Sequence, residues 1–440
     1  MDNKPVTLAI VGCGQRGKGY AEYALLAPTK CKVIAVVEPR PKTRKEVADA
    51  HGVDPSLVFA TWKDFHSAST ETIKTVGKRL VDAIVVAVQD NMHAEVVLAF
   101  SEQGYHMLCE KPMATTAEEC VRMAAAVKKA GIIFGVGHVL RYSPYSKALY
   151  EVINSGSLGK LINIQHMEPI GYYHFAHSYV RGNWGKEENS CFSLMTKSCH
   201  DIDIICSWMS PAIPVRVSSF GSLQHFKKSE KPQTAGSATR CLDCPIANEC
   251  PYSAKRIYLD PVANDFTGWP VSPLIDGVPD IENITMALKT GPYGRCVYET
   301  DNDVVDNQVV NLEFSNGATV SFTMVAFTSA ICERQTRLHF SHGEIVGDMA
   351  KFTVTDFRPK PAKATMHRPP QDGGGHGGGD LGLISAFVKA VSTGKQGVLG
   401  TDIDEVLQSH LTVFAAEKSR REGKVIDVQD FGKDIKARCT

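Results

Sequence analysis

Residues 6–17 read Val-Thr-Leu-Ala-Ile-Val-Gly-Cys-Gly-Gln-Arg-Gly, an apolar run that passes directly into a glycine-rich turn. The run predicts a buried strand, and the residues that follow have the pattern of a helix. In such a unit Gly12 permits the tight turn, Gly14 lets a pyrophosphate approach the backbone, and Gly17 lets helix and strand pack closely. The helix N-terminus adds free N–H groups and a positive dipole end. The stretch therefore predicts a dinucleotide site.

The remainder of the first 136 residues continues the alternation of strand and helix patterns. Further apolar runs predict buried strands at residues 32–37, 83–88, 106–110 and 132–136. Alternation of this kind gives a parallel sheet that is covered by helices on both faces. We therefore predict that residues 1–140 form an α/β Rossmann domain, whose ligand binds at the carboxyl ends of the strands.

Glu38 ends the second predicted strand, about 20 residues after the glycine turn, where a carboxylate can accept hydrogen bonds from a ribose diol. A carboxylate there also repels a 2′-phosphate, so the position favours NAD, while Arg40 and Arg44 leave NADP as an alternative. His93 begins a helix, and it either approaches the nicotinamide ribose or caps that helix. The predicted cofactor contacts are Gly12, Gly14, Gln15, Arg16, Gly17, Glu38, Arg40, Val88, His93, Glu110, Lys111 and Arg141.

Residues 141–440 predict a second, α+β domain with a large, mainly antiparallel sheet, because apolar runs are joined there by short polar turns. Strands are predicted at 162–167, 215–220, 308–314, 318–327, 335–340 and 351–357, with hairpin turns at 315–317 and 341–343. Helices are predicted at 145–154, 200–208, 381–392 and 402–421. Residues 225–303 are polar and rich in proline and predict a long insertion. Residues 358–380 predict a loop that is flexible or ordered only by a ligand.

The composition excludes several classes of protein. The 440 residues contain 48 basic and 48 acidic side chains, so there is no basic excess for a polyanion. The apolar run at 83–88 is far shorter than the roughly 20 residues of a membrane span, and the first residues lack an apolar signal region. Thirteen cysteines without a secretion signal predict reduced thiols. We expect a soluble cytoplasmic protein that handles a small molecule.

Cys109-Glu110-Lys111-Pro112 follows the strand at 106–110, which places Lys111 near the cofactor. Oxidation of an alcohol requires a hydride acceptor and a base for the hydroxyl proton. Burial and a cationic nicotinamide would both lower the pKa of a lysine and make it a better base. An ion pair between Lys111 and Glu110 is the structural alternative.

With these residues the sequence resembles the Gfo/Idh/MocA family, named for glucose–fructose oxidoreductase, inositol dehydrogenase and rhizopine catabolism. The matching segments are residues 12–17, 110–112, 141–142 and 199–203, and the resemblance covers nearly the whole chain except the insertion. It implies an NAD(P)-dependent oxidoreductase that acts on sugars, cyclitols or glycosides. It also implies a homo-oligomer, a dimer or a tetramer, formed through the open sheet face.

The resemblance implies that His200, on a helix of the second domain, faces the same cleft as Lys111, and these two are the predicted catalytic residues. The family pattern has an Asp four residues before this histidine, whereas Thr196 stands here. The departure removes a negative charge, and a helix-packing role for His200 is the alternative. The predicted substrate contacts are Lys111, Tyr142, His177, Tyr179, Arg181, Trp184, Thr196, His200, Asp201 and His376.

Cys241-x-x-Cys244-x5-Cys250-Pro251 lies inside the insertion, and a two-residue gap lets adjacent thiolates bind one tetrahedral metal ion. The insertion is too polar to hold itself with a core, so a metal would supply folding energy. We predict a structural zinc site with Cys296 as the fourth ligand and His225 as the alternate. Free thiols and an iron–sulfur cluster are the other interpretations.

Three functions fit these patterns. The first is a dehydrogenase that transfers hydride between NAD and a secondary hydroxyl of a sugar, cyclitol or glycoside. The second is a redox glycoside hydrolase or lyase, in which transient oxidation acidifies a neighbouring C–H and the cofactor is regenerated. The third, motivated by Thr196, is a non-catalytic dinucleotide sensor.

Overall fold

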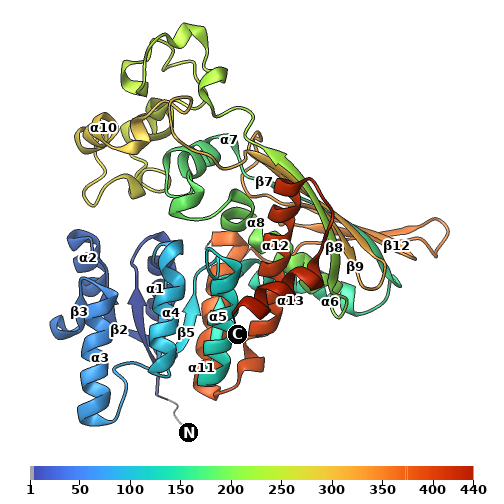
Figure 1. The fold of residues 1–440 in the computed structure, drawn as a ribbon, viewed down its shortest axis with the longest axis horizontal. Coiled ribbons are helices and arrows are strands. Elements are labelled where there is room, and N and C mark those ends of the chain that lie inside the picture. The colour runs from blue at the N-terminus through green and yellow to red at the C-terminus, as the bar shows by residue number, and fades with distance from the viewer. Residues whose placement is uncertain (1–3, 372, 374, 440) are drawn as a thin grey trace.

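The computed structural model describes residues 4–371, 373 and 375–439. Figure 1 shows a Rossmann domain in blue and cyan, a broad second sheet beside it, and the insertion as a separate lobe above the Rossmann domain. The first sheet has the order β3-β2-β1-β4-β5-β6 with parallel neighbours. Its strands are β1 (Val6–Val11), β2 (Cys31–Val37), β3 (Val58–Phe59), β4 (Ala83–Val86), β5 (His106–Cys109) and β6 (Phe134–Val136). The predicted α/β domain is confirmed.

Helices cover this sheet on both faces, as expected. They are α1 (Gln15–Leu26), α2 (Pro41–His51), α3 (Trp62–Val76), α4 (His93–Glu102) and α5 (Ala117–Ala130). One further helix arrives from the far end of the chain, because α11 (Gly379–Thr393) buries Leu383, Phe387 and Val388 in the same core as β1. Residues 406, 407, 411 and 435 also join the buried core of this domain, so a boundary at residue 140 leaves out more than one element that packs there.

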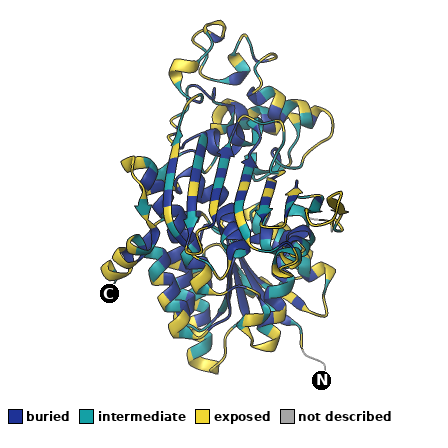
Figure 2. Cartoon of the chain, turned by 90° about the vertical axis from the view of Figure 1, so that its right-hand side faces the viewer, coloured by how far each residue is buried: buried dark blue, intermediate teal, exposed yellow. Residues whose placement is uncertain are grey.

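The second sheet has nine strands in the order β14-β13-β12-β11-β7-β10-β9-β8-β15. All neighbours are antiparallel except β7 and β10, so the predicted mainly antiparallel sheet is confirmed. Figure 2 shows buried and exposed residues alternating along its strands. The strands are β7 (Leu161–Pro169), β8 (Pro214–Ser222), β9 (Asn307–Phe314), β10 (Thr319–Val325), β11 (Gln335–Phe340), β12 (Gly343–Gly347), β13 (Phe352–Asp356), β14 (Lys363–His367) and β15 (Ile426–Asp427).

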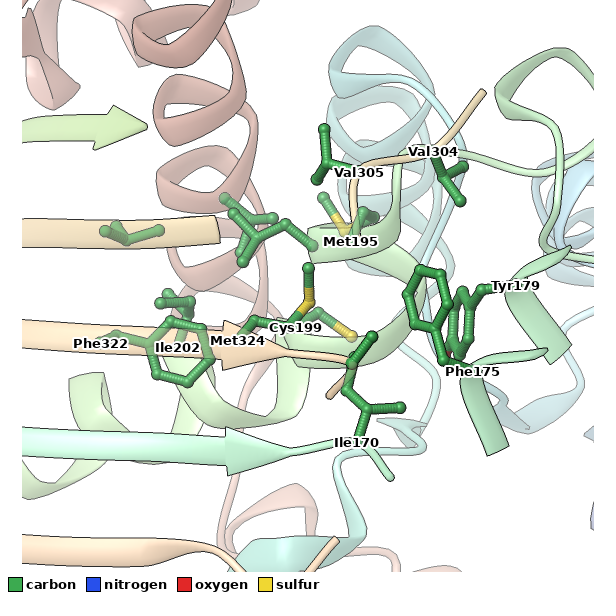
Figure 3. Close-up of a cluster of buried hydrophobic side chains, with 14 of the residues drawn as sticks. Ile170, Phe175, Tyr179, Met195, Cys199, Ile202, Val304, Val305, Phe322 and Met324 are labelled. Atoms are coloured by element: carbon green, nitrogen blue, oxygen red, sulfur yellow. The ribbon is translucent and has the colours of Figure 1, made fainter. Parts of the chain in front are cut away.

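The helix α8 (Ser193–Met209) lies between this sheet and the Rossmann domain. Its residues Met195, Cys199 and Ile202 recur at helical spacing and pack against Phe322 and other buried apolar side chains (Figure 3). Because this face is fixed by the core, Thr196 and His200 are presented on an adjacent face. The other helices are α6 (Pro144–Asn154), α7 (Tyr172–Phe175), α9 (Asp260–Ala263), α10 (Ile281–Thr290), α12 (Ile403–Glu422) and α13 (Val428–Arg438).

Two predictions are wrong. The segment 358–380 is not a loop throughout, since residues 363–367 form β14 on the sheet edge, where nearly every side chain is exposed and leaves no apolar alternation to detect. The insertion does contribute to a core, because Tyr258, Ile284 and Leu288 are fully buried there. The prediction followed the polar, proline-rich composition of the segment and overlooked Ile284 and Leu288, which lie at helical spacing on α10. None of the helices in the described part of the chain combines the length and apolar character needed to cross a bilayer.

Candidate active site

The glycine turn forms a cradle with room for a phosphate group. A Cβ on Gly12 would lie 2.3 Å from the Ala87 carbonyl oxygen, and one on Gly17 would lie 1.9 Å from the Gly12 oxygen. Gly14 is different, because its nearest neighbour would be Arg40 Nη2 at 4.0 Å. Gly14 is also the N-cap of α1 and makes no side-chain cap, so the first amides of the helix are free of side-chain partners. These residues fit a dinucleotide.

Glu38 follows β2 and is buried beside this turn. Its carboxylate accepts hydrogen bonds from the Cys13 amide at 2.8 Å and from Arg40 Nε at 2.7 Å. Burial alone would raise the pKa of Glu38, but the bonds from Arg40 and Cys13 outweigh it and hold the pKa below its usual range. Glu38 is therefore ionised at neutral pH, and Arg40 is its partner.

Glu110 pairs with Arg16 and not with Lys111. Arg16 Nε donates to Glu110 Oε1 at 2.7 Å and Arg16 Nη1 donates to Asp380 Oδ2 at 2.8 Å. Tyr20 donates to the same Glu110 oxygen at 2.6 Å. The network joins the cofactor turn, the loop after β5 and the start of α11, and it leaves the Lys111 ammonium without an acidic partner from Glu110.

Lys111 contacts α8 of the second domain. Its Nζ donates to the carbonyl oxygen of Thr196 at 2.6 Å and lies over the ring of Trp184, 5.3 Å from the centroid. The indole N–H of Trp184 in turn donates to Asp90 Oδ2 at 2.7 Å. Asp90, which follows β4, was not predicted, because the sequence around it shows no signal beyond its charge.

His200 lies at the same place. Its ring centroid is 6.0 Å from that of His138 and 5.7 Å from that of His376. Burial, and then the nearby charge of Lys111 and the neighbouring His376, hold the pKa of His200 well below its ordinary value. The structure thus brings Lys111 and His200 together, and His200 is neutral at physiological pH.

His376 is oriented by a carboxylate, and it belongs to the loop that precedes α11. Its Nδ1 lies 2.9 Å from Asp380 Oδ1, while the other oxygen of Asp380 accepts from Arg16. His376 has a backbone φ of 54°, in the left-handed region. The predicted substrate contact His376 is therefore beside His200, in a strained and partly buried position.

A buried group of charges lies behind α8, and sequence analysis did not identify most of it. Arg334 pairs with Glu168 Oε2 at 2.6 Å and with Asp201 Oδ1 at 3.0 Å. The same Asp201 oxygen lies 3.1 Å from His166 Nε2, and Lys197 pairs with Glu168 Oε1 at 3.1 Å. Asp201 is fully buried in this network, and its role as a substrate contact stays a prediction.

Arg141 and Tyr142 do not join Lys111 and His200. Arg141 binds both oxygens of Asp203 at 2.6 and 2.8 Å, and the Tyr142 hydroxyl lies 3.2 Å from Thr401 Oγ1. Both residues line a cavity of about 420 Å³ to which neither Lys111 nor His200 contributes. The cofactor role of Arg141 and the substrate role of Tyr142 stay predictions, and the structure places both side chains in contacts other than those of Lys111. The partner Asp203 lies on α8, so the sequence around residue 141 does not predict this ion pair.

His93 holds the Glu-Lys-Pro loop in place. Its Nδ1 lies 2.7 Å from the Pro112 carbonyl and its Nε2 lies 3.2 Å from the Val88 carbonyl. The Lys111–Pro112 bond is cis. With both ring nitrogens against backbone oxygens, His93 links the loop to the end of β4 and does not cap α4 through its side chain.

The segment 176–184 contacts the insertion more than the cleft. His177 Nδ1 lies 3.0 Å from the Tyr258 hydroxyl, and Tyr179 is buried in a stack with Trp184. Arg181 Nη2 donates to the Tyr252 carbonyl at 2.7 Å and to Cys241 Sγ at 3.3 Å. The substrate role predicted for Arg181 is thus corrected, because its guanidinium lies at the cysteine cluster.

The four predicted metal ligands line one cavity of about 20 Å³, and they are Cys241, Cys244, Cys250 and Cys296. An antiparallel bridge between Arg240 and Arg295 brings the first and last of these cysteines side by side. His225 is not among the lining residues, and its Nε2 lies 3.0 Å from the Tyr298 hydroxyl. The geometry therefore favours Cys296 over His225 as fourth ligand.

A cluster of one cysteine and two histidines lies in the interface between α8 and α12. Among the described residues, His138, Cys199 and His410 have ligand atoms that all lie within 4.8 Å of one another. His410, however, has Nε2 2.9 Å from the Met113 amide and Nδ1 2.9 Å from the Val406 carbonyl. Its imidazole is thus occupied by backbone groups, and the group is a packing cluster.

Two family models match the chain. One describes an oxidoreductase family with an NAD-binding Rossmann fold and matches residues 6–138, and the other describes the C-terminal alpha/beta domain of that family and matches residues 150–428. The chain therefore belongs to the Gfo/Idh/MocA oxidoreductase family.

Relatives agree with this assignment. The protein YteT of Bacillus subtilis (strain 168) is 21% identical over 321 residues, which are 69% of this chain and 71% of YteT. Inositol 2-dehydrogenase 2 of Saccharopolyspora erythraea is 29% identical over 158 residues, 36% of this chain and 43% of that enzyme. The structure of levoglucosan dehydrogenase with NADH and levoglucosan superposes with a TM-score of 0.69 at 17% identity, covering 97% of this chain and 100% of the other.

Proposed function

We propose that the protein transfers hydride between a nicotinamide cofactor and a secondary hydroxyl of a sugar, cyclitol or glycoside. The observation that carries the proposal is the convergence of Lys111 and His200 at the carboxyl end of the Rossmann sheet, beside a glycine cradle that fits a dinucleotide. When bound, the cofactor would supply the acceptor for the hydride. The similarity to an inositol dehydrogenase and to a levoglucosan dehydrogenase supports the substrate class.

The chain's own groups would bind and orient the substrate. Lys111 is a donor held by the Thr196 carbonyl and by the face of Trp184, and it can turn one N–H toward a substrate oxygen. His200 is neutral and buried, so it can accept a proton without first losing one. We therefore propose that Lys111 and His200 contact the substrate, with Lys111 as the hydrogen-bond donor to its oxygen.

NAD is the cofactor that the adenosine end favours. Glu38 is ionised there, and Asp276 of the insertion accepts hydrogen bonds from the amides of Lys42 and Thr43 nearby. Two carboxylates at this end would repel a 2′-phosphate. Arg40 offers little compensation, because its guanidinium is already paired with Glu38.

A redox-neutral glycoside hydrolase or lyase is the second candidate, and the insertion favours it. Gln15 Nε2 in the cofactor turn donates to Ser272 Oγ at 2.8 Å, and Asp276 binds the start of α2. A lobe that covers the adenosine end would slow cofactor release, which suits a cycle that returns the cofactor to its starting state. The sensor remains the third candidate and has no such observation in its favour.

One assay separates these functions. The protein is incubated with stoichiometric NAD and a panel of inositols, anhydro sugars and aryl glycosides, and reduced cofactor and released aglycone are followed together. Net reduced cofactor supports the dehydrogenase, whereas aglycone without net reduction supports the redox-neutral enzyme. Tight NAD binding with neither product would refute both.

We further propose that the four cysteines of the insertion bind a structural zinc ion. A cavity of about 20 Å³ has room for one ion and not for an iron–sulfur cube. In the described chain no three of these sulfurs lie within 4.8 Å of one another, so binding would require rotation of at least one thiol side chain. The donor set of thiols suits zinc.

Metal analysis of the full chain tests this site. We expect about one zinc per chain, as in other four-thiolate sites, and loss of zinc with a lower melting temperature in Cys244→Ser. Cys439→Ser, which changes a half-buried thiol outside the insertion, is the control and should keep its zinc. Unchanged zinc content in Cys244→Ser, or iron in its place, would refute the assignment.

We also propose that the enzyme works in the reducing cytoplasm as a homo-oligomer. All thirteen cysteines are free thiols in the structure, which supports a reducing compartment. The exposed Phe220, Val346 and Met366 lie on strands of the large sheet and support an interface there. Sedimentation analysis that found only monomers would refute the proposed homo-oligomer.

A further inference from the structure

We propose that His376, oriented by Asp380, is the residue that takes the proton from the substrate hydroxyl. This inference rests on the oxidation proposed above and assigns a catalytic role that the sequence pattern gave to Lys111 or His200. The carboxylate that a catalytic imidazole needs would thus come from the start of α11 and not from α8.

The contact with Asp380 fixes the tautomer of His376. An ionised carboxylate only accepts hydrogen bonds, so the Nδ1 that lies 2.9 Å from Asp380 Oδ1 must carry the hydrogen. Nε2 is then left with its lone pair. The pKa of Asp380 is held well below its usual range because bonds from His376 and Arg16 outweigh the effect of burial. Asp380 therefore stays ionised and acts as the positioning residue.

His200 lacks an equivalent partner. Its Nδ1 is buried without a hydrogen bond among the described residues. Thr196, one turn earlier on α8, contributes only its carbonyl, to Lys111, because its hydroxyl turns back to the Phe192 carbonyl at 3.4 Å. Asp201 and Asp203 are engaged by Arg334 and Arg141. An imidazole without an orienting carboxylate is the weaker base of the two.

The charges around His376 suit a proton acceptor. The groups that face it are Asp380 from α11, Arg16 from α1, Arg334 from the loop before β11, and His200 from α8. Burial, opposed by Asp380, lowers the pKa of His376, so the ring is neutral at physiological pH and ready to accept a proton. The imidazolium that forms is then paired with the Asp380 carboxylate, as in other histidine–carboxylate dyads.

The step balances within the proposed oxidation. The O–H bond of the substrate breaks and its proton forms the Nε2–H bond of His376. A nicotinamide cofactor, when bound, would supply the acceptor for the hydrogen and the electron pair of the C–H bond at the carbon that bears this hydroxyl. A carbonyl remains, and Lys111 can donate a hydrogen bond to its oxygen.

The first experiment needs no turnover. Histidine-labelled protein is examined by long-range proton–nitrogen NMR at neutral pH, and the His376 signal is assigned from its loss in His376→Gln. We expect Nδ1 protonated and Nε2 unprotonated, and we expect this tautomer to be lost in Asp380→Asn. An Nε2–H tautomer, or a doubly protonated ring, in the wild-type protein would overturn the inference.

The second experiment uses the substrate panel described above. His376 lies in the left-handed region, so glycine fits its backbone, and His376→Gly should fold normally. We expect kcat to fall about 100-fold, the lower range for loss of a general base, with NADH affinity unchanged and activity partly restored by added imidazole. His342→Gln, in the exposed β11–β12 turn, is the control.

The outcomes distinguish failure of the role proposed for His376 from failure of the proposed function. If the wild-type protein turns over a member of the panel and His376→Gly is equally active, the inference fails while the proposed function stands. If the wild-type protein reduces no cofactor with any member, the proposed function fails, and the tautomer measurement still decides whether the dyad exists.

Discussion

Lys111 is the residue whose position local sequence determines best. It follows a parallel strand, and ligands bind at the carboxyl end of such a strand. That Lys111 lies close to the glycine turn could therefore be predicted. The contacts of Lys111 could not be predicted, because the Thr196 carbonyl and Trp184 belong to segments that are remote in the sequence. The same limit explains Arg141 and Arg181, whose partners lie on other elements.

Replacement of Lys111 by methionine keeps the length of the side chain and removes its charge. We expect kcat to fall about 100-fold or more, since the substrate oxygen loses its donor, with little change in the NADH dissociation constant. Lys63→Met, at an exposed pair with Glu95, is the matched control. Wild-type turnover by Lys111→Met would show that this residue is not catalytic. The measurement is steady-state kinetics with a fluorescence titration of NADH.

Among the elements, those with a strong apolar period were predicted with nearly correct bounds, such as β1 and β11. The strand β14 was missed because it lies at the edge, where pairing with β13 and not burial defines it. The insertion was predicted as a segment, but its helix α10 was not, although Ile284 and Leu288 have helical spacing. Its contacts with α2 were not predicted either, since they depend on residues of the other domain.

The contact of the insertion with α2 leads to a prediction about cofactor release. Arg40, the N-cap residue of α2, makes no side-chain capping bond. Asp276 of the insertion caps the helix instead, because it accepts hydrogen bonds from the amides of Lys42 and Thr43. Loss of such a cap costs about 1 kcal/mol of local stability. We expect Asp276→Ala to speed NADH dissociation several-fold in stopped-flow displacement. Asp49→Ala, which removes an exposed carboxylate from the same helix, should not change it.

At the scale of the whole molecule, buried neutral histidines make stability depend on pH. Burial, with nearby Arg181, lowers the pKa of His177 to about 3, and burial, with His138, does the same for His410. An unfolded histidine has a pKa near 6.5, so below that pH the unfolded chain binds more protons than the folded one. The stabilising contribution is therefore present above about pH 6.5 and is lost as the pH falls toward 3.

We expect the free energy of unfolding to fall by about 1.4 kcal/mol per pH unit for each of these two histidines as the pH is lowered from 6 to 4. Denaturant melts across this range measure the slope. His410→Gln, whose side chain does not titrate, should have a shallower slope than the wild-type protein. An identical slope in the two would contradict the assignment of His410 as a buried neutral group.

The two-domain architecture follows from sequence patterns, because strand–helix alternation and hairpin turns distinguish the two sheets. The packing of α11 on the Rossmann domain does not follow from sequence patterns. This packing places Asp380 beside Arg16 and so helps to form the site. The candidate site thus combines residues from α1, the loop after β5, α8 and α11, and only their packing together defines its chemistry.

Transfer of an isotopic label tests the central claim most directly. A substrate from the panel, deuterated at the carbon that bears the reacting hydroxyl, is incubated with the protein and NAD, and the reduced cofactor is analysed by mass spectrometry. We expect one deuterium in the reduced nicotinamide ring with wild-type protein, and formation of this product about 100-fold slower or more with Lys111→Met. Reduced cofactor without deuterium, or label lost to water while wild-type protein consumes substrate, would contradict direct hydride transfer.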